Sequence, residues 1–154
     1  MMQRVAEHLY SIAITLWVGA LWAIGYLAAP VLFRLLDDRA LAGRVAGEMF
    51  TYVAWLGIAA AAYLLVFVAL RKEGGAFRSS VFWLVLLMLL LTVAGYFGVQ
   101  PILAQLKADS FPREVMESAL RDRFVAWHGV SSVVYLVQSL LGLMLVALQG
   151  RGLR

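Results

Sequence analysis

Polar side chains recur at helical spacing along the last long apolar segment of the chain. His128 is followed by Ser131 and Ser132 at the third and fourth positions, and by Tyr135 at the seventh. This spacing places their side chains on one face of a helix. An imidazole can ligate haem or a metal or carry a proton, and hydroxyl groups both donate and accept hydrogen bonds. We therefore predict a ligand-binding group of His128, Ser131, Ser132 and Tyr135. Arg121, two helical turns earlier, is a further candidate.

His128 is the only ionisable side chain other than tyrosine within the apolar segments, and such residues in a membrane are functional candidates. It also lies only four residues after Phe124, where its segment begins, so a role in hydrogen bonding between helices is the competing interpretation. We expect no haem or metal. The alternative is a b-type haem held by His128 or His8, although an antiparallel arrangement places these histidines at opposite membrane faces.

The positions of the charged residues indicate which elements carry these side chains. All 22 charged residues fall outside four apolar runs, at 9–33, 49–70, 79–106 and 124–150. Even the shortest run would be ~33 Å long as a helix, which exceeds the ~30 Å hydrocarbon core of a bilayer. No run alternates with period two, so helices must satisfy the backbone. The sequence predicts an all-α integral membrane protein: one four-helix transmembrane bundle over residues 1–154.

Composition excludes several classes of function. The chain has no cysteine, which removes disulfides, thiolate metal sites and thiol nucleophiles. No run contains a carboxylate for a proton relay, and the known nucleotide-binding and hydrolase motifs are absent. The connectors are too short for a soluble catalytic domain, so any chemistry must take place between the helices, and the sequence favours a protein that is not an enzyme. The net charge of +4 favours contact with anionic lipid head groups over nucleic acid.

Orientation rests on lysine and arginine. With four spans, both termini share a side with the turn at 71–75. Six basic residues lie in the short segments of that side, and seven lie in the two longer connectors opposite. The six basic residues on the side of the termini are more densely spaced than the seven opposite. This density predicts that the termini are cytoplasmic, in a bacterial inner membrane. A homo-oligomer is left open.

Two pairs of similar segments in the sequence predict an internal repeat. Val53–Gly57 returns as Val125–Gly129, 72 positions later, and Gly25-Tyr26 with Pro30 returns as Gly95-Tyr96 with Pro101. We predict two parallel halves, about 1–76 and 77–154, related by a pseudo-two-fold axis along the membrane normal. Chance is the alternative, because 64% of the residues are apolar.

The two longer connectors share a pattern. Asp38 and Ser110 are both suited to N-cap positions, and Pro112 is suited to a first turn. The polar leaders Arg39–Glu48 and Arg113–Arg123 follow them without a breaker. We therefore predict that the second and fourth helices begin well outside the membrane.

Several short motifs resemble a known family. The chain is similar to transmembrane protein 205-like proteins, which carry the domain of unknown function numbered 4149, and more distantly to copper-resistance D-type and haem-biosynthetic four-helix proteins. The resemblance implies a four-helix membrane fold and no established activity. Where that family is expected to have asparagine, seven residues after the histidine, this chain has Tyr135. The motifs are Ala119-Leu120-Arg121, Phe124, His128-Gly129-Val130-Ser131-Ser132, His8-Leu9, Trp17-Val18-Gly19, Leu32-Phe33-Arg34 and Pro101.

Three functional interpretations remain open. The first is a protein that binds or helps to transport a small ligand, with a polar pocket around His128. The second is a redox protein that handles haem or a metal through the same histidine. The third is a structural or assembly protein of the bilayer, which needs no pocket.

Overall fold

A computed structural model describes residues 2–71, 75–110 and 115–153. The predicted turn at 72–74 and the predicted first-turn Pro112 lie outside the described residues. The elements are, in order, α1 (Met2–Trp22), η1 (Ala23–Ala28), α2 (Ala29–Leu35), α3 (Arg39–Arg71), η2 (Ala76–Arg78), α4 (Ser80–Val93), η3 (Ala94–Val99), α5 (Gln100–Ser110), η4 (Val115–Glu117) and α6 (Arg121–Gly152).

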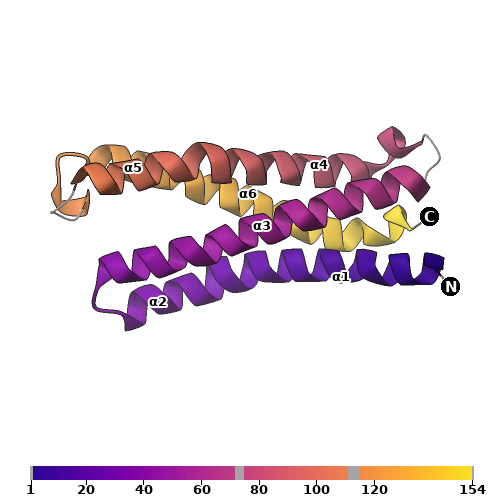
Figure 1. The fold of residues 1–154 in the computed structure, drawn as a ribbon, viewed down its shortest axis with the longest axis horizontal. Helices are drawn as coiled ribbons and strands as arrows, with labels where there is room; N and C mark the ends of the chain where they lie inside the picture. Colours follow the sequence, from indigo (N-terminus) through magenta and orange to yellow (C-terminus); the bar gives the residue numbers. More distant parts are fainter. Residues whose placement is uncertain (1, 72–74, 111–114, 154) are drawn as a thin grey trace.

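Four helices are long and apolar enough to cross a membrane: Gln3–Leu35, Arg39–Arg71, Ser80–Ser110 and Arg121–Gly152. No strand occurs in the described part of the chain. The prediction of an all-α four-helix membrane bundle is confirmed. Sequential helices run antiparallel, so both termini lie at one end of the bundle, called here the terminal end (Figure 1). The opposite end, with residues 36–38 and 115–120, is called the loop end.

The start of α3 follows the prediction. The Asp38 side chain accepts a hydrogen bond from the backbone N–H of Leu41, with an N–O distance of 2.9 Å. This contact satisfies a donor of the first turn that has no partner within the helix. From Arg39 the helix runs unbroken to Arg71, so its polar leader is helical as predicted.

The start of α6 differs from the prediction. Ser110 is the last residue of α5, and its hydroxyl donates back to the Lys107 carbonyl at 2.8 Å. Residues 115–117 form a single 3₁₀ turn, and Ser118 donates to the Val115 carbonyl at 2.8 Å. The predicted unbroken leader from 113 to 123 is therefore wrong. The hydroxyls of Ser110 and Ser118 bind backbone carbonyls three residues earlier, and such local bonds compete with continuation of the helix.

The first and third spans each contain a π-helical segment, η1 and η3. The backbone N–H of Ala29 donates to the Ile24 carbonyl, and that of Gln100 donates to the Gly95 carbonyl, five residues back in both cases. Pro30 and Pro101 each follow two residues after the segment ends. Proline has no N–H, and its ring would clash with the carbonyl four residues earlier. The wider π turn accommodates proline without ending the helix.

The tightly packed core lies between the π-helical segments and the terminal end. There α1 and α4 each contact both α3 and α6. Toward the loop end the chain separates into two hairpins, in which α2 packs on α3 and α5 packs on α6 (Figure 1). The largest fully buried side chains are Tyr10, Ile14, Trp17, Leu64, Val68, Val81, Val85, Met88, Ser139 and Leu145.

Candidate functional site: a cavity between two hairpins

A cavity of about 520 Å³ lies between the two hairpins, and all four spans contribute to its wall. Trp17 and Gln138 mark its limit toward the terminal end, while Phe33, Gln100 and His128 lie toward the loop end. Both π-helical segments line it through Gly25 and Gly95, among others. No aspartate, glutamate, lysine or arginine is among its lining residues. The wall is therefore mainly apolar and aromatic, with a few polar groups.

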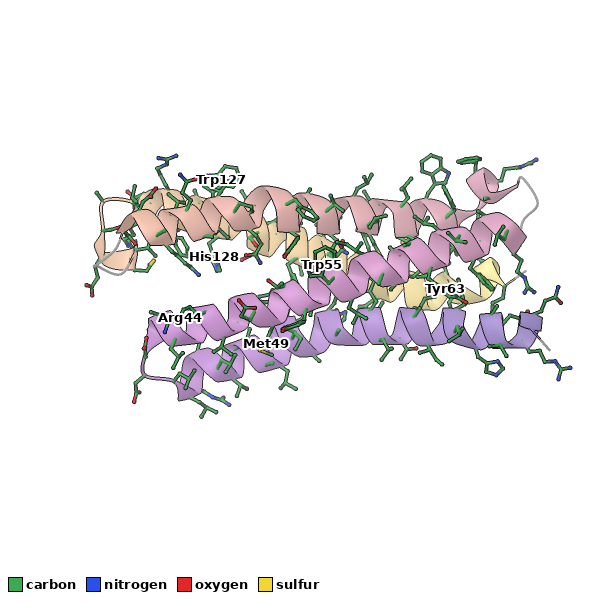
Figure 2. The ribbon with its side chains drawn as sticks, in the orientation of Figure 1. Arg44, Met49, Trp55, Tyr63, Trp127 and His128 are labelled. Atoms are coloured by element: carbon green, nitrogen blue, oxygen red, sulfur yellow. The ribbon has the colours of Figure 1, made fainter. Side chains whose placement is uncertain are left out.

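Four of the five predicted site residues line this cavity: His128, Ser131, Ser132 and Tyr135. In Figure 2 the His128 side chain lies in the space between the hairpins, toward the loop end. Arg121 is not among the lining residues. It is the first residue of α6, and its guanidinium lies 3.6 Å from the Asp122 carboxylate at an exposed position. The structure thus brings the α6 stripe together at the cavity wall and leaves Arg121 at the helix end.

His128 belongs to a stacked group at the loop end of the cavity. Its ring lies nearly parallel to that of Phe124, with 5.8 Å between ring centroids. The Lys107 ammonium from α5 lies 5.8 Å from the centroid of the same Phe124 ring, within reach of a cation–π contact. Among the described residues the imidazole nitrogens have no hydrogen-bond partner. The nearby Ser132 hydroxyl donates to the backbone carbonyl of His128 and not to its ring. His128 is an exposed residue of the cavity wall.

His8 lies at the other end of the bundle. The Tyr10 hydroxyl donates to the Gln149 carbonyl at 3.0 Å, which places this part of α1 beside the end of α6. His128 precedes Gln149 by 21 residues, or ~30 Å along the helix. One haem iron cannot take both histidines as axial ligands. The described residues also contain no cluster of three or more His, Asp or Glu side chains that could hold a metal.

Tyr135 joins α6 to the π-helical segment of the first span. Its hydroxyl donates to the Leu21 carbonyl at 2.7 Å. Its ring packs edge-on against Phe50 of α3, with centroids 5.1 Å apart, and lies directly against Gly25. Any side chain at Gly25 would overlap the tyrosine ring. The tyrosine therefore fills the space beside η1.

Gln138 is a polar residue of the cavity wall that the sequence interpretation missed. It is 4% exposed, and its side-chain N–H₂ donates to the Met88 carbonyl at 3.0 Å and to the Thr92 hydroxyl at 2.8 Å. Its Oε1 atom is buried and has no hydrogen-bond partner among the described residues. The signal was present in the sequence. Gln138 follows Ser131 by seven positions and Tyr135 by three, so it shares their helix face.

The family described as domain of unknown function (DUF4149) matches residues 12–112 of the chain. The chain belongs to this family. No curated protein and no solved structure matches it. The predicted likeness to transmembrane protein 205-like and copper-resistance D-type proteins finds no support in these comparisons.

The DUF4149 match covers three walls of the cavity and not the fourth. Residues 12–112 include Trp17, both π-helical segments and Thr92. They exclude α6, which carries Gln138 and the predicted stripe. The predicted motif His128-Gly129-Val130-Ser131-Ser132 lies outside the matched DUF4149 region.

Proposed function

We propose that this protein binds a small, mostly apolar molecule within the bilayer, in the cavity between its two hairpins. The supporting observation is a space of about 520 Å³ that all four spans line and that gathers polar groups on one helix, α6. Apolar walls with a few placed polar groups are typical of small-molecule sites. A purely structural role is the outcome that the experiment below separates from binding.

The position of the cavity limits what it can hold. Gln138 lies near the middle of α6, which spans residues 121–152, and His128 lies ten residues closer to the loop end. This separation is ~15 Å along the helix. The cavity thus extends from about the centre of the membrane to one surface. Cytoplasmic termini, as the basic residues predict, would place it in the outer leaflet.

Charge selects the class of ligand. An unpaired charge costs far more to bury than a neutral group. Toward the centre of the membrane the lining residues include no acidic or basic side chain to pair with it, because His128 lies at the loop end. The Lys107 ammonium lies near the loop end of the cavity, beyond the lining residues. The enclosed part of the ligand is therefore uncharged.

The test uses the full chain in lipid nanodiscs with 1-dodecanol as the probe. Binding to the folded state should raise the midpoint of thermal unfolding with increasing probe concentration. A Gly95→Phe substitution should abolish this rise, because Gly95 lines the cavity and a Cβ atom added there meets no atom within 4 Å, which leaves room for the ring to enter the cavity. The matched control is Gly19→Phe, at a site that is equally open but outside the cavity. Equal stabilisation of the wild type and Gly95→Phe would contradict the proposal.

A further inference from the structure

The helix faces that line the cavity continue past it toward the loop end. On α5, Lys107 follows the lining residue Gln100 by seven positions. On α3, Gly43 precedes the lining residue Phe50 by seven positions. Residues seven apart share a helix face and are separated by ~10 Å along the axis. Lys107 and Gly43 therefore lie just beyond the cavity, on the sides of α5 and α3 that face it.

The Lys107 side chain crosses the gap between the two hairpins at this point. A Cβ atom added at Gly43 would lie 3.8 Å from the Lys107 Nζ atom. The same Cβ atom would lie 3.9 Å from the Cζ atom of Phe33, which lines the cavity. From α6, the Phe124 ring centroid lies 5.8 Å from the ammonium and 5.8 Å from the ring of the lining residue His128. The ammonium thus lies among residues of all four spans, at the loop end of the cavity.

The positive charge of Lys107 has no anionic partner among the described residues. The ion pairs that these residues form are Arg71–Glu7 and Arg121–Asp122. Lys107 is an exposed residue close to the end of its helix. Lysine side chains near helix ends extend to the membrane interface, where lipid head groups lie. An anionic group at this interface can pair with the ammonium while an attached alkyl chain enters the apolar cavity.

We propose that the ligand is a single-chain amphiphile whose anionic head group pairs with Lys107 while its chain occupies the cavity. This inference rests on the proposed function, because it names the chemical class that the same cavity takes. The volume of about 520 Å³ lies within the range of about 300–1,000 Å³ that is usual for one small molecule. The chain is uncharged, as the apolar wall requires, and the charge lies beyond the lining residues.

The experiment compares dodecyl phosphate, which is anionic at neutral pH, with 1-dodecanol in nanodiscs of neutral lipid. Affinities for the full chain come from the concentration dependence of thermal stabilisation. Lys107→Met should weaken the binding of dodecyl phosphate roughly 5-fold, which corresponds to an ion pair of about 1 kcal/mol. It should leave the binding of 1-dodecanol unchanged, and Lys107→Arg should keep both affinities. Each probe enters the same bilayer in every case, so a ratio between variants reports on the protein.

The matched control is Arg44→Met, which removes one positive charge from the same end of the bundle (Figure 2). Arg44 is exposed and is not a lining residue, so the affinity for dodecyl phosphate should not change. A second pair of variants acts at Gly43. Gly43→Asp places a carboxylate within reach of the Lys107 ammonium and should weaken the binding of dodecyl phosphate. Gly43→Asn has the same size without the charge and should not, and this pair decides the matter if Lys107→Met does not fold.

Three results would count against these proposals. Equal effects of Lys107→Met on the two probes, or equal effects of Lys107→Met and Arg44→Met on dodecyl phosphate, would overturn the inference while the cavity still binds. Stabilisation of Gly95→Phe by dodecyl phosphate that depends on Lys107 would show that the lysine binds head groups of the bilayer surface, which also overturns it. If neither probe binds the wild-type protein, the proposed function itself fails.

Discussion

The two π-helical segments, η1 and η3, have the same backbone construction and different surroundings. Each has a hydrogen bond to a carbonyl five residues back and a proline two residues past its end. Beside η1 the ring of Tyr135 lies against Gly25. Beside η3 a Cβ atom added at Gly95, which lines the cavity, would meet no atom within 4 Å. The cavity therefore has one filled flank and one open flank.

Both segments also lie at the same depth in the bundle. The Trp22 indole N–H, just before η1, donates to the Ser139 carbonyl. Thr92, just before η3, accepts from the neighbouring residue of α6, Gln138. A shared backbone device at a shared depth supports the proposed duplication. Equivalent π-helical segments thus line one cavity, and side chains of α6 complete its wall.

The largest expected effect separates Gly25 from Gly95. Gly25→Ala should lower the free energy of unfolding by about 2–3 kcal/mol, because the new methyl group overlaps the Tyr135 ring and forces α6 away from η1. Gly95→Ala should leave stability unchanged or raise it by up to about 1 kcal/mol, since alanine favours helix. Thermal unfolding in nanodiscs, followed by circular dichroism, measures both variants. Equal effects of the two substitutions would break the contrast between the segments.

A double variant sharpens the same prediction. Replacing Tyr135 with Val removes the ring that meets the new methyl group. The cost of Gly25→Ala should then shrink by at least about 1 kcal/mol relative to its cost in the wild-type background. Additive effects would show that the cost arises within η1 and not at the contact with α6.

The next effect concerns the indole hydrogen bonds beside the two segments. Trp22→Phe removes the half-buried donor to the Ser139 carbonyl, and it should cost about 1–2 kcal/mol. Trp55→Phe removes the donor to the Tyr96 hydroxyl beside η3, where the indole is 51% exposed. It should cost less than about 1 kcal/mol, because exposed groups lose less packing. The ratio of urea-unfolding rates of the two variants provides the measurement, and a larger effect for Trp55 would be the contrary result.

The smallest effect belongs to the α6 wall itself. Ser132 donates to the His128 carbonyl within its own helix, at 2.9 Å. Ser132→Ala should therefore change the free energy of unfolding by less than about 0.5 kcal/mol, because the bond joins no two helices. A loss of more than about 1 kcal/mol in the same thermal assay would show that the serine supports the wall in a way the contacts do not reveal.

In the second and fourth spans, the tryptophans that the proposed repeat pairs lie at different depths in the bundle. Trp55 lies beside η3, where its ring centroid is 5.7 Å from that of Tyr96. Gln138 lies at the depth of η3. Trp127, the residue that corresponds to Trp55 at the offset of 72, precedes Gln138 by eleven residues, which places it ~16 Å nearer the loop end. Figure 2 shows the two tryptophans well apart along the bundle. The duplication stays a proposal, supported by the π-helical segments rather than by these tryptophans.

Much of the α6 stripe was accessible to sequence reasoning, because helical periodicity alone assigns residues to one face. His128, Ser131, Ser132 and Tyr135 needed only their spacing. Gln138 shared that spacing and was overlooked. Arg121 was assigned from its motif. A motif does not say whether a side chain two helical turns before His128 reaches the same cavity. The break at 115–120 was missed because serine hydroxyls compete with the helix through local turns that pattern reading does not weigh.

The sequence by itself determined four spanning helices and their antiparallel order, because long charge-free segments have few alternatives in lipid. It also determined which α6 residues share a face. Only the tertiary structure decided that the hairpins separate toward the loop end, that Tyr135 fills the space beside η1, and that Gln138 keeps an unpaired acceptor. These features depend on contacts between residues such as Gly25 and Tyr135, which are 110 positions apart. Periodicity within one helix carries no information about the neighbour on the other side of a contact.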